Sequence, residues 1–300
     1  MPPSNTAAWL TKPKTPLSVS SAPYTPPGPD QIVVRSRAIA VNYCDWAKQD
    51  LGSMLFPWVK LPFVMGEDVA GEVVEVGAGA DASFKVGDRV LSHAVGLDKI
   101  SSGASEGAFQ EYVVLRAGLV ARIPDSVAFE RACVLPVCLS TAATGLFCDK
   151  HLGLDLPSLD NNAATDGRKA GKGARYIVSA CCKGTDKAYV AQMSLNGPPP
   201  PKPGALNLVS WLAGAAYAWI STLVKKNLKG VKVEFVWGSD LYDGPVAEAV
   251  YGSFLPAALA KGSFVPAPEP QVIGHGLDKV QEAFEVGRKG VSAKKLVVTV

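Results

Sequence analysis

The chain predicts an α/β fold of two domains, a mostly antiparallel β-barrel and a shortened parallel-sheet domain. Between residues 62 and 115, short β-branched runs alternate with glycine turns at barrel-like spacing. Between residues 175 and 237, segments with strand and helix patterns alternate, which is typical of a parallel sheet. With 300 residues, 48% of them hydrophobic, the chain is long enough to bury the cores of two domains.

The barrel strands follow from runs rich in valine and isoleucine. Residues 32–41 form the first strong strand pattern, and residues 69–76 form the next. Further strands are expected from residue 89 and over residues 109–115, and residues 295–300 close the chain with a strand. Because these strands are short and closely spaced, they favour a compact barrel.

Outside residues 175–237, four segments predict helices. A helical turn should begin within residues 42–49, with Asp45 near its start. Residues 124–132 indicate a capped helix start, and the apolar pattern continues through residue 147, so one helix should cross from the barrel to the second domain. Residues 246–259 predict an amphipathic helix interrupted by Pro256, and residues 277–288 predict the last helix.

The second domain should be short. Residues 175–180 and 231–237 predict strands, and residues 187–195 predict a helix. The proline-rich residues 196–204 fit neither a helix nor a central strand. Since one βαβ unit needs about 30 residues, the interval from residue 197 to residue 230 has room for little beyond an apolar helix. We therefore expect a barrel domain at residues 1–137 and 266–300, and a parallel-sheet domain at residues 138–265.

An uncharged apolar segment, residues 205–224, is long enough to span a bilayer. Polar residues within it, and its place inside a two-domain chain, favour a buried or interface helix over a membrane-associated one. The net charge of +3 is small and the basic residues are scattered, so no nucleic-acid partner is expected. The N-terminus lacks a secretory pattern and the six cysteines include no C-x-x-C pair, which predicts a cytoplasmic protein without a structural zinc ribbon.

Three motifs in fixed order give the sequence a resemblance to a known family. They are GEDVAGEVVEVG from Gly66, VGDRV from Val86 and GAFQEY from Gly107. NYCDW from Asn42 and LPVCLSTAA from Leu135 extend the match. The chain resembles the medium-chain dehydrogenase/reductase superfamily over residues 7–159 and 228–300, most of all its fungal zinc-free branch of trans-acting enoyl reductases. The resemblance implies a GroES-like barrel and a shortened Rossmann-like parallel-sheet domain.

The resemblance also indicates where zinc-dependent members would hold their metal. Those places carry Asn42, Glu67 and Cys138. An amide, a carboxylate and one thiol are poor substitutes for a tetrahedral zinc site, so we predict no metal. The three histidines, at positions 93, 151 and 275, are isolated in sequence and are interpreted as surface or packing residues.

Without a metal, the resemblance implies hydride transfer from NADPH to an activated double bond, such as an enoyl thioester, or to a quinone. Family members commonly carry N-P-x-D-W-K where this chain has Tyr43 for the proline and Ala47 for the lysine. Lys48, one position on, should point elsewhere on a helical turn. The catalytic candidates are Tyr43, Cys44 and Thr141. The cofactor-binding candidates are Cys44, Asp45, Trp46, Ala47, Thr141, Lys183, Gly184, Thr185 and Lys295. The substrate-binding candidates are Phe56, Trp58, Cys138, Ser140 and Thr144.

Two of these regions have an alternative interpretation. The aromatic loop at residues 52–63 either covers a pocket mouth or packs the barrel end. No G-x-G-x-x-G follows the strand at residue 175, and in the turn near residue 184 only Gly184 relieves the backbone. Lys183 and Thr185 could bind phosphate there, whereas Asp186 would repel it, so a divergent phosphate loop and a plain surface turn both fit.

The function has alternatives as well. The first expectation is a zinc-independent NADPH-dependent reductase of fungal secondary metabolism. It would act on a small molecule or on an acyl group tethered to a carrier protein of a polyketide synthase, as a monomer or a homodimer. The eroded glycine loop also favours a cofactor-independent cyclase, or a protein that binds a polyketide intermediate. A third interpretation is a non-functional remnant.

Overall fold

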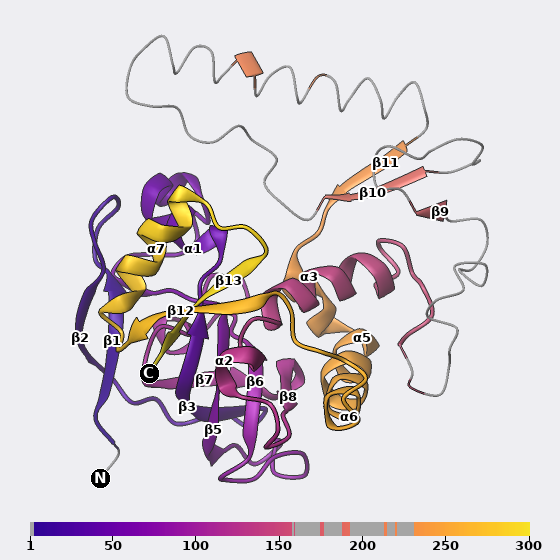
Figure 1. Ribbon diagram of the computed structural model, residues 1–300, viewed down its shortest axis with the longest axis horizontal. Coiled ribbons are helices and arrows are strands. Elements are labelled where there is room, and N and C mark those ends of the chain that lie inside the picture. The colour runs from indigo at the N-terminus through magenta and orange to yellow at the C-terminus, as the bar shows by residue number, and fades with distance from the viewer. Residues whose placement is uncertain are drawn as a thin grey trace. The chain divides into compact units, whose positions relative to one another are not determined.

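The computed structural model describes residues 3–157, 159, 175–176, 188–192, 213–214, 220 and 231–300. The chain divides into two compact units, Met1–Ser140 with Tyr242–Val300, and Thr141–Leu241. Residues 242–265, which the sequence assigned to the second domain, group with the first unit. Figure 1 shows the chain coloured from its N-terminus to its C-terminus.

The first unit is built on a seven-stranded sheet (Figure 1). Its order is β12-β13-β3-β5-β6-β8, and β7 pairs with β3. Only β12 and β13 run parallel to each other; the other pairs are antiparallel, as predicted. The strands are β3 (Gln31–Ala40), β5 (Asp68–Val76), β6 (Arg89–His93), β7 (Tyr112–Arg116), β8 (Val120–Arg122), β12 (Glu269–His275) and β13 (Lys294–Thr299). A three-stranded sheet of order β2-β1-β4 joins β1 (Asn5–Leu10), β2 (Ser18–Ala22) and β4 (Phe63–Val64).

The core of this unit lies around β3 and β5. Ile32, Ile39 and Val69 are fully buried, and buried positions make up most of β3 and the first half of β5. A methyl group at Gly71 of β5 would lie 2.1 Å from the carbonyl oxygen of Arg35. The second glycine of the GEDVAGEVVEVG motif is therefore required by the close approach of β3.

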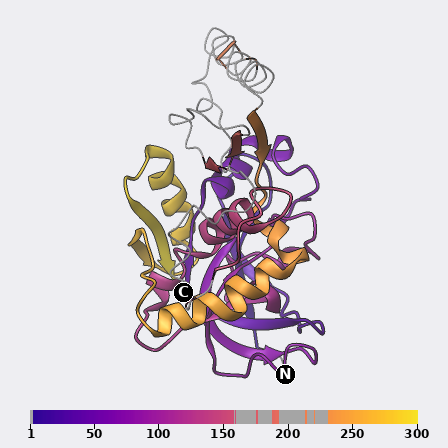
Figure 2. The same ribbon diagram turned by 90° about the vertical axis from the view of Figure 1, so that its right-hand side faces the viewer.

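Ten helical segments belong to this unit or extend from it. They are α1 (Tyr43–Leu51), η1 (Gly52–Met54), η2 (Ala104–Glu106), η3 (Ala117–Leu119), α2 (Phe129–Ala132), α3 (Pro136–Phe147), α5 (Pro245–Ala247), the π-helical η7 (Glu248–Phe254), α6 (Leu255–Ala260) and α7 (Lys279–Lys289). The segments α5, η7 and α6 form one continuous helical run, drawn in orange in Figure 2. Pro256 is accommodated in the first turn of α6, directly after the π-helical segment.

The helix predicted from residue 124 to residue 147 is two helices. The first, α2, begins only at Phe129, and its N-cap Ala128 makes no side-chain hydrogen bond, so the expected cap is wrong. The second, α3, begins at Pro136. Proline lacks an amide hydrogen and suits the first position of a helix, which explains the break. The boundary between the two compact units falls within α3, at Ser140 and Thr141.

The second unit contains a parallel three-stranded sheet of order β11-β10-β9. Its strands are β9 (Arg175–Tyr176), β10 (Ala188–Gln192) and β11 (Val231–Phe235), followed by η6 (Gly238–Asp243). The helix predicted over residues 187–195 is therefore wrong, because its centre is a strand. The tyrosine and valine within AYVAQ fit a strand better than a helix. Parallel pairing confirms the α/β class of this unit.

The apolar segment at residues 205–224 lies outside the described residues, apart from positions 213, 214 and 220. The proline-rich residues 196–204 lie outside them as well. Within the part of the chain that the structure describes, no helix has the length and apolarity needed to cross a membrane.

Candidate active site

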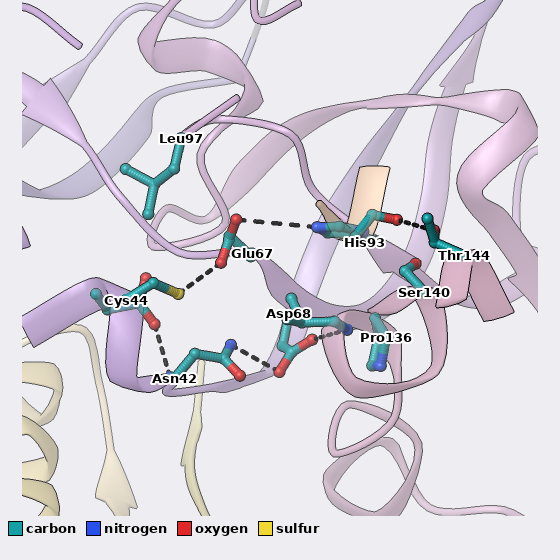
Figure 3. Close-up of polar contacts among 12 residues, drawn as sticks. Asn42, Cys44, Glu67, Asp68, His93, Leu97, Pro136, Ser140 and Thr144 are labelled. Carbon is teal, nitrogen blue, oxygen red and sulfur yellow. Dashed lines mark hydrogen bonds and ion pairs between the residues drawn. The ribbon is translucent and has the colours of Figure 1, made fainter. Parts of the chain in front are cut away.

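Buried polar side chains gather where α1, β5, β6 and β13 meet in the first unit (Figure 3). Strand register brings them together: Asp68 of β5 pairs with Ala40 on one side and with His93 of β6 on the other. Asn42 follows Ala40 by two residues and caps α1. Asp68 is fully buried, and His93 is 2% exposed. The site is thus positioned by the central strands of the sheet.

One part of this cluster has balanced charges, and we call Asn42, Asp68 and Lys295 the ion-pair group. The Lys295 Nζ lies 2.8 Å from the Asp68 Oδ2 and also donates to the Asn42 Oδ1. The Asn42 Nδ2 donates to the same Asp68 oxygen at 2.9 Å, and the Val137 amide donates to the Asp68 Oδ1 at 2.7 Å. Burial lowers the pKa of Lys295, but Asp68, Cys138 and Cys44 together raise it more. Each charge in this group therefore has an opposite partner.

The other part, which we call the acid group, consists of Cys44, Asp45, Glu67 and His93. The Cys44 thiol donates to the Glu67 Oε2 at 2.7 Å, and the Glu67 Oε1 lies 3.9 Å from the His93 Nε2. Figure 3 shows the Glu67 carboxylate between the thiol and the imidazole. The Asp45 Oδ2 accepts a hydrogen bond from the backbone amide of Asn42 at 2.7 Å. The Asp45 Oδ1 and both ring nitrogens of His93 are buried without a hydrogen-bond partner.

Burial and the charges of neighbouring side chains shift the pKa values of the acid group. Burial raises the pKa of the Cys44 thiol well above its usual value, and Glu67 raises it further. Burial likewise raises the pKa of the Asp45 carboxyl, with Glu67 as the next cause. For His93, burial lowers the pKa, but Glu67, Asp98 and Asp68 together raise it more. The protonated Cys44 thiol is therefore favoured at neutral pH, and the protonated His93 imidazole persists to a higher pH than an ordinary imidazole.

The positions that the resemblance compares with zinc ligands carry donors that suit zinc poorly. The Asn42 Oδ1, the atom that would face a metal, accepts the Lys295 ammonium, and its amide nitrogen is bonded to Asp68. Cys138 is exposed. Donor atoms of Cys44, Asp45 and Glu67 do lie within 4.8 Å of one another. That set offers three acidic groups and lacks the histidine and paired thiolates of the zinc centres that the resemblance implies.

Residues predicted beside the nicotinamide take part in packing at α1. Tyr43 is 49% exposed, and its ring meets Trp46 edge to face at 5.6 Å. The Trp46 ring contacts Phe284 of α7 at 6.5 Å, and Ala47 is buried. Asp45 is completely buried. Cys44, half-buried, is the member of the acid group with partial exposure.

Lys48 is directed away from the acid group, as the helical position predicted. Its Nζ donates to the carbonyl oxygens of Gly52 at 3.1 Å, Leu55 at 2.8 Å and Phe56 at 2.9 Å. The side chain is 1% exposed, and burial lowers its pKa. Lys48 therefore holds the loop after α1.

The two aromatic substrate-binding candidates pack against each other. Phe56 is 8% exposed, and its ring centroid lies 5.7 Å from that of Trp58. The Trp58 Nε1 donates to the Leu97 carbonyl at 3.0 Å. Such contacts are the ones expected if the loop at residues 52–63 packs the barrel end.

The remaining candidates lie on α3 or outside the described residues. The Ser140 Oγ lies 2.7 Å from the Tyr251 hydroxyl, and the Thr144 Oγ1 donates to the Gly238 carbonyl at 3.0 Å. Both side chains are fully buried. Thr141 is half-buried on the same helix. Lys183, Gly184 and Thr185 lie outside the described residues.

Sequence reasoning missed the two residues that organise the cluster, Asp68 and His93. Lys295, which was assigned to the cofactor, forms an ion pair with Asp68, and its cofactor role stays a prediction. Strand register brings all three together, because Asp68 and His93 are cross-strand partners and β13, which carries Lys295, pairs with β3. That register depends on the three-dimensional pairing of distant segments.

A cavity of about 280 Å³ lies elsewhere in the first unit. Its wall includes Phe84, Arg122 and Tyr251, and none of the residues of the ion-pair or acid groups. It therefore gives no access to the buried cluster.

Comparisons with known proteins agree with this architecture. Residues 28–125 match the alcohol dehydrogenase GroES-like domain. The dehydrogenase pigH of Monascus ruber is 36% identical, covering 99% of this chain and 100% of that protein. The trans-enoyl reductase himH of Aspergillus japonicus is 31% identical, covering 99% of this chain and 97% of that protein. The structure of mycobacterial Rv1454c complexed with NADPH has a TM-score of 0.61 at 19% identity, covering 99% of this chain and 100% of that chain.

The alignment with the Monascus protein spans 369 positions, more than the 300 residues of this chain. The relative therefore carries segments without a counterpart here, in agreement with a shortened chain. The motifs, the barrel and parallel sheet, and the full-length relatives all point to one group. The chain belongs to the medium-chain dehydrogenase/reductase superfamily, an oxidoreductase superfamily, and within it resembles the fungal enoyl reductases.

Proposed function

We propose that the chain is a zinc-independent, NADPH-dependent reductase of an activated double bond, in which the Cys44 thiol supplies the proton. The observation that carries this proposal is the 2.7 Å hydrogen bond from Cys44 to the buried Glu67. It places a protonated, half-buried thiol within an oxidoreductase fold whose zinc-ligand positions are otherwise engaged. Relatives named trans-enoyl reductase support the reaction class.

The proposed substrate is an enoyl thioester. A bound NADPH would supply the hydride to the β carbon. Negative charge then collects on the thioester oxygen, and the α carbon takes a proton. That proton comes from Cys44: its S–H bond breaks, a C–H bond forms at the α carbon, and a thiolate is left beside Glu67. Because burial and Glu67 raise the thiol pKa, Cys44 carries the proton throughout the neutral range.

The second unit would bind the coenzyme. Its three described strands are parallel and adjacent, the arrangement in which strand carboxyl ends share one edge for a dinucleotide. We propose Thr141 near the nicotinamide, and Lys183, Gly184 and Thr185 at the phosphates. Asp45 and Lys295 already have internal partners and are left out of this set. The structural neighbour solved with NADPH supports the choice of coenzyme.

The substrate proposal extends to the cellular setting. An acyl chain tethered to the carrier domain of a polyketide synthase would present the enoyl thioester, and a quinone is the other acceptor of suitable chemistry. Fungal relatives named dehydrogenase and trans-enoyl reductase support this setting.

The experiment that tests the proposal compares Cys44→Ala with wild type. An N-acetylcysteamine enoyl thioester serves as probe, NADPH oxidation is followed by absorbance, and coenzyme binding by NADPH fluorescence. We expect kcat to fall by about 10²- to 10⁴-fold, the usual effect of removing a positioned acid, with NADPH affinity unchanged. Cys148→Ser, at another half-buried cysteine, is the matched control and should keep kcat within about twofold.

Three results would overturn the proposal. If NADPH shows no saturation at millimolar concentration, reduction is wrong and a cofactor-independent role takes its place. If Cys44→Ala turns over like wild type, the proton comes from another group. If the purified chain holds one zinc ion that Cys44→Ala releases, the reaction is not zinc-independent, because Cys44, Asp45 and Glu67 would then be its ligands.

A further inference from the structure

The imidazole of His93 has no hydrogen-bond partner although it is buried. His93 ends β6 and is 2% exposed, and neither ring nitrogen is bonded. Buried polar groups in native proteins are almost always paired, so an unpaired imidazole requires an explanation. The Glu67 Oε1 lies 3.9 Å from its Nε2.

The other oxygen of the same carboxylate accepts the Cys44 thiol at 2.7 Å (Figure 3). Glu67 therefore has one oxygen toward the thiol and one toward the imidazole. At 3.9 Å the imidazole contact is longer than a hydrogen bond. Catalytic contacts are often long before substrate binds and shorten in the complex. The three side chains are arranged in the order needed to pass a proton from ring to thiol.

We propose that His93 is a proton-relay residue that restores the Cys44 proton through Glu67 after each turnover. The inference rests on the proposed function, in which Cys44 gives its proton to the substrate. His93 acts through Glu67 and does not touch the substrate, so it is a positioning residue.

The proton balance closes within these three side chains. After reduction, Cys44 is a thiolate and His93 is an imidazolium. The N–H bond of the imidazolium breaks and its proton forms an O–H bond at the Glu67 Oε1. The resulting carboxyl group then turns to bring this O–H bond to the thiolate, where the O–H bond breaks as an S–H bond forms. Cys44 is again a thiol, Glu67 is again a carboxylate and His93 is neutral. His93 then regains its proton from water before the next turnover.

The charges around His93 favour the protonated ring. Within the described residues it faces three carboxylates: Glu67 just before β5, Asp68 at the start of β5, and Asp98 in the loop after β6. These charges raise its pKa above the ordinary 6.5 despite burial. The relay should therefore be complete at low pH and be lost as the pH rises through the raised His93 pKa.

The test combines an activity measurement with a measurement that needs no activity. The chain has three histidines, so ¹⁵N-histidine NMR gives three side-chain titrations, assigned with His93→Asn and His275→Asn. We expect the His93 pKa to lie above 6.5 in wild type and to fall in Glu67→Gln. In parallel, pH profiles of kcat and solvent deuterium isotope effects are recorded for the NADPH-dependent reduction of the enoyl thioester probe.

His93→Asn should lower kcat at neutral pH by on the order of tenfold, less than the loss of the donor itself, and should remove the decline of kcat with pH. It should also enlarge the solvent isotope effect, because reprotonation becomes slow. His275→Asn, at an exposed histidine that contacts Thr299, is the matched control and should keep the wild-type profile.

The outcomes separate this inference from the proposed function. If wild type reduces the probe and His93→Asn keeps its pH profile and isotope effect, the relay is wrong and the proposed function stands. If the His93 titration is insensitive to Glu67→Gln, the relay is wrong whatever the activity. If the titrations behave as expected but wild type never oxidises NADPH, the proposed function is wrong, and the His93–Glu67 coupling serves no reduction.

Discussion

The ion-pair group and the acid group lie side by side in one buried cluster, yet they differ in how their charges are satisfied. Asp68 has an ammonium, an amide and a backbone N–H as partners. Within the part of the chain that the structure describes, the ion pair found for Glu67 is with His93, none is found for Asp45, and three buried atoms of the acid group lack any hydrogen bond. Satisfied buried networks fix structure, whereas unsatisfied ones with shifted pKa values are typical of reactive sites.

The comparison indicates that the two groups have different roles. The ion-pair group ties β13 to the start of α1 and to β5, through Lys295, Asn42 and Asp68. Its hydrogen bonds hold the two segments that carry Cys44 and Glu67. The acid group can then keep unpaired atoms, because its own backbone is already fixed by the neighbouring pairs.

The largest expected effect comes from breaking the ion-pair group. Lys295→Met removes the ammonium and leaves the Asp68 carboxylate buried without a counter-charge. Loss of one partner of a buried pair costs about 3–5 kcal/mol, so the free energy of unfolding should fall by that amount. Urea unfolding followed by tryptophan fluorescence and circular dichroism measures it.

The double variant Asp68→Asn with Lys295→Met is the control for this prediction. It removes both charges, so it should recover a large share of the stability that Lys295→Met loses. If Lys295→Met unfolds at the wild-type urea concentration, the pair contributes little, and the contrast between the two groups does not hold.

A second buried ammonium, that of Lys48, tests whether a buried charge needs an oppositely charged partner to stabilise the fold. Lys48 is satisfied by the carbonyl oxygens of Gly52, Leu55 and Phe56, without a carboxylate. Lys48→Met leaves these carbonyls without their donor, so the free energy of unfolding should fall by about 2–3 kcal/mol. The same urea experiment measures it.

Lys60→Met, at an exposed lysine of the following loop, is the matched control and should change stability by less than about 0.5 kcal/mol. Equal stability of the two variants would contradict a structural role for Lys48. The burial of Lys48 lowers its pKa, so charging it costs more in the folded than in the unfolded chain. Folding should accordingly weaken as the pH falls from 10.5 to the lowered pKa, with no further loss through Lys48 below it.

Much of the barrel was predictable because local patterns determine it. The β-branched runs that became β3 and β5 are buried on both faces, and Gly71 stands where β3 leaves no room for a side chain. The second unit was harder, since AYVAQ follows a charged turn and was interpreted as a helix. Its strand form depends on parallel pairing with β9 and β11, which are distant in sequence.

The site was predictable only where one segment contains it. Cys44 and Asp45 lie in the NYCDW motif, so the motif located them. Glu67 was considered only as a missing zinc ligand, and His93 as a packing residue. Their proximity follows from the pairing of β5 with β6, and the partner of Lys295 from the pairing of β13 with β3. No local pattern encodes those neighbours.

The smallest expected effect comes from removing one negative charge from the acid group. Unlike the other substitutions, this one should leave the free energy of unfolding unchanged or raise it. Asp45 is fully buried, and a carboxylate oxygen of it lies within 4.8 Å of one from Glu67. Asp45→Asn keeps an oxygen that can accept the Asn42 amide and replaces the unpaired oxygen by a donor. The variant should therefore be as stable as wild type or more stable at neutral pH, by up to about 1 kcal/mol.

The pH dependence decides whether charge is the cause. The folded-state pKa of Asp45 is raised above 3.8, so wild type loses stability through this group as the pH rises from that value to the raised pKa. Asp45→Asn lacks this loss, and its advantage over wild type should grow with pH in urea unfolding across the acidic and neutral range. Asp81→Asn, at an exposed aspartate, should show the same dependence of stability on pH as wild type. A destabilised Asp45→Asn with a wild-type pH slope would show that the Asp45 carboxylate is satisfied in the fold, and the two groups would no longer differ in charge balance.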